Sequence, residues 1–234
     1  MVKSKFCDCN VHPLPEGKDT VARMINFAKH LGYQRIIITL HSDSELSPSD
    51  IPTDVKGIEV YRGIEVKTQS PSKLNGLIGK YRKAADFLSV HGGNEKINRL
   101  AVENPYVDCL MHPLTEKNSG LNHVLAKEAV RNNVAIEFNM DLILKSRGGR
   151  RVYAFSHFKT NLMLARKYGV ATIVASNSRS IFHMRAPREM IAISQLFGMN
   201  EREANDSIST IPGEILDKNC INNGAVFEGV KILE

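Results

Sequence analysis

Short apolar runs rich in β-branched residues recur seven times along the chain and alternate with segments of helical spacing. They lie at residues 6–10, 35–40, 58–66, 87–90, 107–111, 135–139 and 172–175. Strands that alternate with helices are typical of repeated βα units around a mainly parallel sheet. Seven such units predict an α/β fold, a seven-stranded (β/α) TIM-like barrel whose functional loops follow the C-terminal ends of the strands.

The segments between these runs predict the surrounding helices. Residues 20–31 carry apolar side chains at helical spacing and stop at Gly32, the residue type best suited to a left-handed helix end. The expected helices cover residues 20–31, 72–84, 95–103, 121–130, 152–168, 187–197, 200–207 and 211–219. With 234 residues, 42% of them hydrophobic, the chain can bury one core of barrel size, so we expect a single domain over residues 1–234.

Residues able to bind metal ions stand at the ends of successive apolar runs. They are Asp8, His12, His41, Glu65, His91 and His112. Carboxylates and imidazoles that meet at one barrel mouth are ligand types that bind metal ions in proteins. The row ends at Ser176-Asn177-Ser178-Arg179, which supplies neither ligand type. We therefore expect a barrel of metal-binding design whose chemistry has been dismantled.

The positive charge is concentrated in one window. Residues 142–188 contain no Asp or Glu and ten Lys or Arg, whereas the rest of the chain holds 21 basic and 25 acidic residues. The net charge of +6 is therefore the sum of a local +10 and −4 elsewhere. Such a window can be an ordinary solvated face. Clustered arginines also bind phosphates through charge-assisted hydrogen bonds, so we favour a polyanionic partner.

Two glycine pairs lie beside basic residues. Residues 145–151, which read KSRGGRR, predict a mobile loop whose backbone can approach a phosphate and which leads into a helix N-terminus. Residues 91–94 predict a comparable turn into a helix that carries Lys96 and Arg99. Aromatic residues make up 6% of the chain and Trp is absent, so we expect recognition by shape and backbone and not by base stacking.

The sequence shows no sign of export. The first residues lack the continuous apolar segment of a signal peptide, and no apolar run approaches the ~20 residues needed to span a bilayer. The four cysteines have no C-x-x-C spacing, and Cys7 and Cys9 are expected on one strand face as small apolar side chains. We expect a reduced, cytoplasmic location and no membrane partner.

The strand-end residues resemble motifs of the polymerase and histidinol phosphatase (PHP) superfamily of metal-dependent phosphoesterases. The strings DCNVH, TLH, GIE, SVH, MHP and SNSR stand where that family has D-x-H-x-H, T-D-H, G-x-E, a strand-end His, H-P and S-D-x-H. Asn10, Leu40, Asn177 and Arg179 depart from the pattern. The resemblance implies a PHP-like barrel with a reduced ligand set, in which Arg179 places a fixed cation near any metal.

A closer resemblance covers nearly the whole chain. Residues 92–139, which include GGNEKINRLAVENPYVDCLMHP, and residues 153–198, which include LMLARKYGVATIVASNS, resemble the archaeal ribonuclease P protein component 3 family. This implies a subunit of the ribonucleoprotein that removes the 5′ leader of precursor tRNA, in which the RNA cleaves with its own Mg²⁺. It also implies a heterotetramer with the component 2 protein, contacts with other ribonuclease P proteins, no cofactor on this chain and no activity of the isolated chain.

Basic residues on loops or helix starts at the functional end of the barrel are expected to contact RNA, together with one histidine. They are Arg99, His112, Lys117, Arg147, Arg150, Arg151 and Arg179. We predict no catalytic residue and no metal ligand. The residues that survive from the ligand row can either hold one ion or hydrogen-bond among themselves; they are His12, His41, Glu65, His91 and His112. Two alternatives stay open: a metal-dependent PHP-type phosphoesterase, and a module whose basic face binds an acidic protein.

Overall fold

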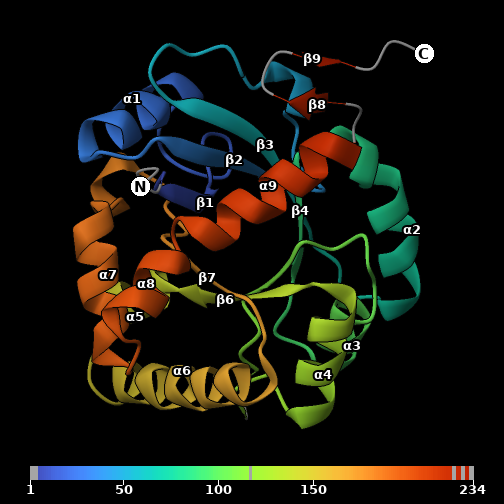
Figure 1. Cartoon of the computed structure of the whole chain (residues 1–234), viewed down its shortest axis with the longest axis vertical. Helices are drawn as coiled ribbons and strands as arrows, with labels where there is room; N and C mark the ends of the chain where they lie inside the picture. The colour runs from blue at the N-terminus through green and yellow to red at the C-terminus, as the bar shows by residue number, and fades with distance from the viewer. Residues whose placement is uncertain (1–4, 116–117, 223–224, 228–229, 232–234) are drawn as a thin grey trace.

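The centre of the protein is a parallel barrel of seven strands (Figure 1). The computed structural model describes residues 5–115, 118–222, 225–227 and 230–231. Neighbouring strands follow one another in sequence order, and their bounds are β1 Cys7–Val11, β2 Arg35–His41, β3 Glu59–Val66, β4 Phe87–His91, β5 Cys109–Met111, β6 Ala135–Asn139 and β7 Thr172–Ala175. The predicted α/β barrel and all seven of its strands are confirmed, with ends displaced by no more than two residues.

The barrel closes between its first and last strands. Beyond the end of β7, Ser178 forms an isolated parallel bridge with Val11. The Ser178 carbonyl accepts a hydrogen bond of 2.8 Å from the His12 amide, and the Ser178 amide donates to the Asn10 carbonyl at 3.2 Å. The segment after β7 is thereby fixed beside the end of β1, at the mouth of the barrel.

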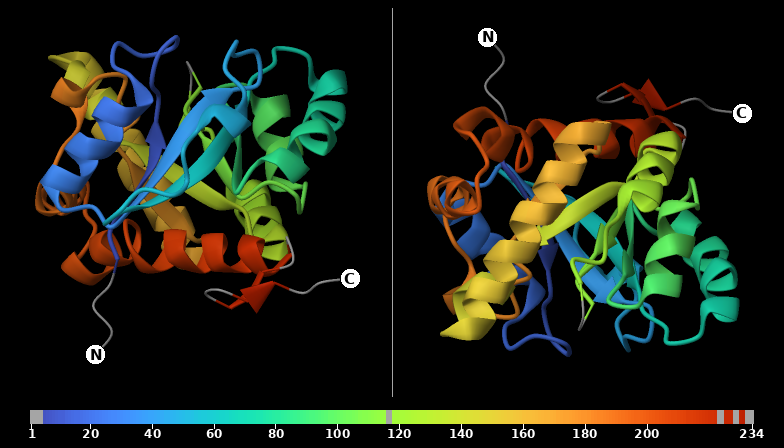
Figure 2. Two further views of the ribbon diagram at one scale, coloured as in Figure 1. Left: turned by 90° about the horizontal axis from the view of Figure 1, so that it is seen from above. Right: turned by 90° about the horizontal axis from the view of Figure 1, so that it is seen from below.

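Helices surround the barrel and cover one of its ends (Figure 2). Their bounds are α1 Val21–Leu31, α2 Pro71–Tyr81, α3 Glu95–Val102, α4 His123–Asn132, α5 Met140–Lys145, α6 Gly149–Tyr168, α7 Pro187–Leu196, α8 Glu201–Asp206 and α9 Thr210–Asn222, with short 3-10 helices η1 Pro48–Asp50, η2 Arg82–Ala84 and η3 Ile181–His183. Two further strands, β8 Ala225–Phe227 and β9 Val230–Lys231, form a separate antiparallel pair. As predicted, α1 ends at Gly32 in a left-handed conformation, with φ of 95°.

The predicted loop over residues 145–151 is shorter than expected, since only residues 146–148 lie outside a helix, and it leads into a helix N-terminus as predicted. Helix α5 ends at Lys145 and α6 begins at Gly149, three residues before its predicted start. Gly148 turns the chain between them with φ of 52° and ψ of −135°, a conformation that an L side chain rarely adopts. One glycine therefore suffices for the turn, and Arg150 and Arg151 lie on the first turn of α6.

Apolar side chains fill the barrel interior below its mouth. Leu216 of α9 packs into this interior cluster and so closes the N-terminal end of the barrel. Cys7, Cys9 and Cys109 are buried there as free thiols, and the Sγ atoms of Cys7 and Cys9 lie 3.8 Å apart. The expected role of these two cysteines as apolar side chains on one strand face is confirmed.

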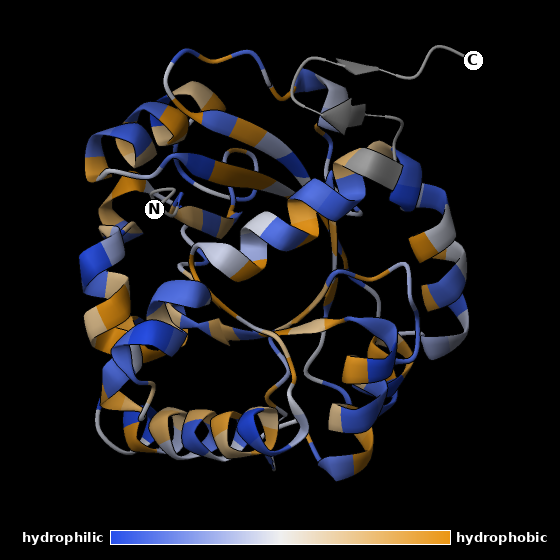
Figure 3. Ribbon diagram, in the orientation of Figure 1, coloured by the Kyte–Doolittle hydropathy of each residue, from blue (hydrophilic) through white to orange (hydrophobic). Residues whose placement is uncertain are grey.

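A second apolar layer lies between the strands and the helices. The helices carry hydrophilic and hydrophobic residues in bands, because one side of each helix faces the barrel (Figure 3). Phe138 of β6, Phe158 of α6 and Phe197 form its aromatic centre, with ring centroids 5.0 to 5.3 Å apart. This packing fixes α6 against β6 and so holds the start of α6 beside the barrel mouth.

Candidate functional site at the barrel mouth

Four histidines at the C-terminal ends of β1, β2, β4 and β5 surround the carboxylate of Glu65. His91 Nδ1 lies 2.5 Å and His112 Nε2 3.5 Å from Glu65 Oε1. His12 Nε2 and His41 Nε2 lie 3.5 and 3.6 Å from Glu65 Oε2. The structure therefore brings together all five residues that survive from the ligand row.

An irregularity in β1 brings a further polar residue to this cluster. The pairing of β1 with β2 shifts register between Asp8 and Val11. Cys9 packs in the barrel interior, and the next residue, Asn10, also reaches inward, where its amide lies 3.4 Å from Met111 Sδ. A bulge of this kind changes which face a residue occupies, so strict alternation cannot place Asn10 from sequence.

A glycine below Glu65 makes space for the packed mouth. Gly63 precedes Glu65 by two residues and so occupies the same face of β3. A Cβ atom on Gly63 would lie 2.6 Å from Ile37 Cγ2 and 2.8 Å from Thr39 Oγ1. Because glycine has no side chain, Gly63 leaves room for the side chains of β2 that lie beside it at the mouth.

The Glu65 carboxylate is ionised although it is fully buried. Burial alone raises its pKa, but the surrounding imidazoles, His112 first and then His41 and His91, hold that pKa well below its ordinary value. Burial of the His112 ring outweighs the attraction of Glu65 and lowers the His112 pKa to about 4. His112 is thus neutral near pH 7; its Nδ1 accepts a hydrogen bond of 2.8 Å from the Asn139 amide, which leaves the Nε2–H directed at Glu65.

A second buried carboxylate at the mouth, Glu137 of β6, was not among the predicted residues. Its Oε2 accepts a hydrogen bond of 2.8 Å from the His112 amide, and its Oε1 accepts one of 3.2 Å from Asn10. Burial, reinforced by the charge of Glu65, raises the pKa of Glu137 to about 8, so the group is largely protonated near pH 7. The period-two pattern that puts Glu137 on the same face as Asn139 is the signal that could have found it.

Within the described part of the chain, two overlapping groups of three side chains could hold a metal ion, and they differ in hydrogen bonding. They are His12, His41 and Glu65, and Glu65, His91 and His112. In the first group, His12 Nε2, His41 Nε2 and Glu65 Oε2 are all buried without a hydrogen-bond partner. In the second, His91 already hydrogen-bonds Glu65. The first group fits a divalent ion, whereas a hydrogen bond already joins two members of the second.

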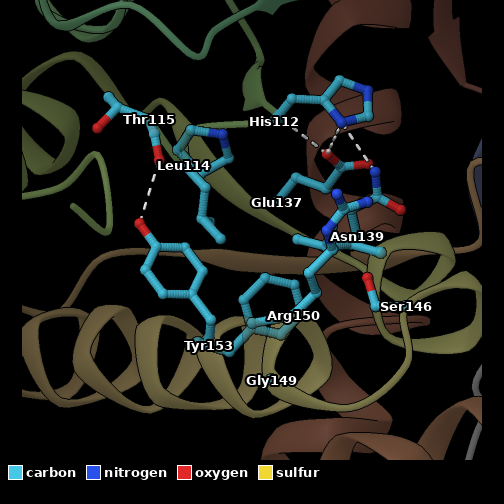
Figure 4. Close-up of a pocket in the computed structure, with 13 residues that line it drawn as sticks. His112, Leu114, Thr115, Glu137, Asn139, Ser146, Gly149, Arg150 and Tyr153 are labelled. Carbon is cyan, nitrogen blue, oxygen red and sulfur yellow. Dashed lines mark hydrogen bonds and ion pairs between the residues drawn. The ribbon is translucent and has the colours of Figure 1, made fainter. Parts of the chain in front are cut away.

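A cavity of about 610 Å³ opens beside the histidine cluster (Figure 4). Its polar end is formed by His112, Glu137 and Asn139, and its opposite wall by α6, from which Arg150 and Tyr153 project. The remaining lining is mostly apolar and includes Pro113, Leu114, Leu142, Ala154 and Phe158. The cavity therefore joins the buried mouth of the barrel to the basic start of α6.

Four of the predicted RNA-binding arginines lie at this end of the protein. Arg147, Arg150 and Arg151 are exposed where α5 gives way to α6. Arg179 follows β7, and its positive charge contributes to the lowered pKa of His112. His112 itself lies within the mouth, with 19% of its side chain exposed.

Arg99 is not part of this group. Arg99 lies in the second half of α3 and not at a helix start, and its Nε donates a hydrogen bond of 2.7 Å to Glu103. Its expected position was therefore wrong, because the helix begins at Glu95 and one turn separates the two. Lys117 lies outside the described residues.

Acidic residues from outside the +10 window neutralise part of its charge in the folded protein. Lys145 forms an ion pair of 2.8 Å with Asp141, which precedes the window by one residue. Arg166 donates two hydrogen bonds of 2.7 Å to Glu203, which follows the window. Arg147, Arg150 and Arg151 form no ion pair with an acidic side chain among the described residues, and they concentrate three positive charges at the start of α6.

Comparison with known proteins identifies the family. The family model for RNase P subunit p30 matches residues 5–222. The ribonuclease P protein component 3 of Methanococcoides burtonii is 48% identical, over all of this chain and 96% of that protein. The chain belongs to the RNase P subunit p30 family. The relative of the same name from Haloarcula marismortui is 35% identical, over 95% of each chain.

Solved structures share the fold of this p30 family member. A chain in a cryo-EM structure of archaeal ribonuclease P with mature tRNA has a TM-score of 0.81 and 27% identity, over 97% of this chain and 98% of that chain. The ochratoxinase of A. niger has a TM-score of 0.61 at 11% identity, over 91% and 71%, which shows the fold alone. No helix in the described residues has both the length and the apolar character needed to cross a membrane.

Proposed function

We propose that this chain is a protein subunit of ribonuclease P that binds and stabilises the RNA subunit of the ribonucleoprotein. The observation that carries the proposal is the full-length relationship to proteins named ribonuclease P protein component 3. The fold of a chain in archaeal ribonuclease P with tRNA supports it. In this proposal the RNA removes the 5′ leader of precursor tRNA with its own Mg²⁺, and the isolated chain is inactive.

The proposed RNA contact centres on the turn between α5 and α6. Arg147, Arg150 and Arg151 are exposed and fall within five successive residues, and Arg150 lines the cavity that leads to the barrel mouth. Guanidinium groups bind phosphate oxygens through paired, charge-assisted hydrogen bonds. Arg179, at the mouth, supplies a fourth positive charge at the same end of the barrel.

The residues at the mouth argue against hydrolysis by this chain. A two-metal phosphoesterase needs two ligand groups whose atoms are free to bind ions. Here His91 hydrogen-bonds one oxygen of Glu65, the neutral His112 lies 3.5 Å from the same oxygen, and the protonated Glu137 carries no charge to offset a second ion. We therefore propose that the barrel keeps its architecture while RNA supplies the chemistry.

The proposal extends to partners and location. The component 2 protein, as the second half of a heterotetramer, and other ribonuclease P proteins would share the complex with this chain, and precursor tRNA would reach it through the complex. We place that complex in the cytoplasm. These assignments rest on the family relationship.

The proposal is tested by neutralising the arginine cluster and measuring the salt dependence of binding. Replacing Arg147, Arg150 and Arg151 with Gln should reduce the slope of log K against log salt for ribonuclease P RNA by about 2 to 3, since each lost phosphate contact removes about 0.9. A matched control replaces Lys159, Arg166 and Lys167 with Gln, which removes the same charge from the far part of the same helix.

The two variants separate a local contact from a general charge effect. We expect the control to keep most of the wild-type slope. Equal slopes for the native protein, the arginine variant and the control would show that the α5–α6 turn does not contact the RNA. Copurification of the native chain with an acidic protein and not with RNA would favour a protein-interaction module instead.

A further inference from the structure

We propose that His12, His41 and Glu65 bind one divalent transition-metal ion, with zinc as the best-fitting ion. The site is independent of RNA binding and is not required by the proposed function. It ties together the ends of β1, β2 and β3, since His12 follows β1, His41 ends β2 and Glu65 lies near the end of β3.

The three ligand atoms already have the spacing of a metal site. His12 Nε2 and His41 Nε2 lie 3.5 and 3.6 Å from Glu65 Oε2, and all three atoms lie within 4.8 Å of one another. Ligands at about 2.0 to 2.1 Å from a tetrahedral zinc ion are about 3.3 to 3.4 Å apart. Closing the site therefore needs only small movements of the two imidazole rings.

The lack of hydrogen bonds to the three ligand atoms favours a bound cation. The side chains of His12 and Glu65 are fully buried and that of His41 is 7% exposed. Yet His12 Nε2, His41 Nε2 and Glu65 Oε2 have no hydrogen-bond partner among the described residues. Buried polar atoms without partners are costly, and they usually mark the place of a ligand, an ion or a water molecule. Three such atoms that converge on one point indicate one shared ion.

Glu16 orients the first ligand. Its Oε2 lies 3.4 Å from His12 Nδ1, and its Oε1 accepts a hydrogen bond of 3.0 Å from the His41 amide. A carboxylate on one imidazole nitrogen directs the lone pair of the other nitrogen toward a metal. Glu16 and Glu65 together carry the two negative charges that offset a divalent cation. Two imidazoles and one carboxylate favour a borderline transition metal over Mg²⁺ or Ca²⁺.

The opposite side of Glu65 supplies the matched control. His91 and His112 contact Oε1 and are engaged in hydrogen bonds, since His91 bonds Glu65 and His112 Nδ1 accepts from Asn139. Our proposal therefore predicts a single ion on the Oε2 side. Loss of His41 should weaken binding strongly, whereas loss of His91 should leave it largely intact.

The experiment measures metal content and affinity. The full chain is stripped with a chelator, titrated with Zn²⁺ by calorimetry and analysed for bound zinc after gel filtration. The native chain should bind one zinc ion per chain. His41→Ala and Glu65→Gln should weaken binding by at least about 100-fold, and Glu16→Gln by about 10- to 100-fold, because it acts through His12. His91→Ala should stay within about 10-fold of wild type.

Two further measurements keep the result interpretable. Circular dichroism in the presence of chelator identifies any variant that fails to fold, and Co²⁺ loaded in place of zinc reports ligand loss through its d–d absorption in the folded variants. Failure of the native chain to bind Zn²⁺ with micromolar affinity would overturn the proposal, as would equal loss of binding in folded His41→Ala and His91→Ala. Since RNA is absent throughout, neither result bears on the proposed ribonuclease P function.

Discussion

Replacing Glu137 with Gln should make the stability of the protein less sensitive to alkaline pH. Glu137 is fully buried, and burial raises its pKa from 4.5 to about 8. The folded protein therefore binds more protons than the unfolded chain between these two values. The stability contributed by the protonated form is complete below pH 4.5 and is lost as the pH rises through about 8.

The size of the effect follows from the shift. Each pKa unit corresponds to 1.36 kcal/mol, so the full difference is at most about 5 kcal/mol. Between pH 6.5 and 8.5, about 2 kcal/mol of it should be lost in the native protein. Gln has no proton to lose, so Glu137→Gln should not show this decline.

The structure offers hydrogen bonds to the new side chain. The Gln oxygen can accept from the His112 amide in place of Glu137 Oε2. Its NH₂ group can donate to Asn10 Oδ1 after rotation of the Asn10 amide, because that oxygen is buried without a partner. The substitution should therefore be tolerated at pH 6.5, with a change in unfolding free energy of no more than about 1 to 2 kcal/mol.

The assay is urea unfolding of both proteins from pH 6.5 to 9 with chelator present. The difference in unfolding free energy between Glu137→Gln and the native protein should change by about 2 kcal/mol in favour of the variant across this range. Glu201→Gln, an exposed substitution at the start of α8, serves as the control for general charge effects. Parallel pH profiles for the native protein and Glu137→Gln would refute the assignment of a protonated carboxyl at the mouth.

Three further predictions concern stability. Phe158→Ala should lower the unfolding free energy by about 3 to 5 kcal/mol in urea, because Phe158 fills the aromatic cluster behind the cavity. Asn98→Ala should cost about 2 to 4 kcal/mol in the same assay, because this buried side chain hydrogen-bonds three backbone groups of neighbouring loops, and an unchanged midpoint would contradict that role. Gly120→Ala should lower the melting temperature sharply, since φ is 74° and a Cβ atom would overlap the Pro113 carbonyl, whereas Gly76→Ala, in open space on α2, should raise it slightly.

The positions of the strands were predictable because each strand of a parallel barrel is a short apolar run with helical segments on both sides. The same rule placed His41, Glu65 and His91 at the ends of β2, β3 and β4. Their convergence follows from parallel strands that end at one mouth. The five surviving ligand residues could thus be grouped before any distance was known.

The contacts of the mouth could not be predicted in the same way. Asn10 turns inward because β1 bulges, and a bulge leaves no reliable mark in the pattern of apolar residues. Glu137 was overlooked because its inward orientation becomes significant only when Asn10 and the His112 amide are found beside it. Hydrogen bonds between strands distant in sequence decide which oxygen of Glu65 is satisfied, and no spacing along the chain encodes them.

The charged residues show the same limit. The absence of acids in residues 142–188 drew attention to the start of α6, but two of the cations in this window are paired with acids outside it. Arg99 illustrates the converse, since a basic residue near a glycine turn proved to pair with Glu103 along its own helix. The distribution of charge along the sequence therefore indicates a region, whereas the ion-pair partners of each side chain can be identified only from the fold.

The central claim is that this chain acts in ribonuclease P as a subunit that supports the RNA. The most direct measurement is reconstitution: ribonuclease P RNA, its other protein subunits and precursor tRNA are combined at modest Mg²⁺, with and without this chain, and release of the 5′ leader is followed. We predict that omission of the chain lowers the cleavage rate and that the chain alone releases no leader. Equal rates with and without the chain would contradict the account.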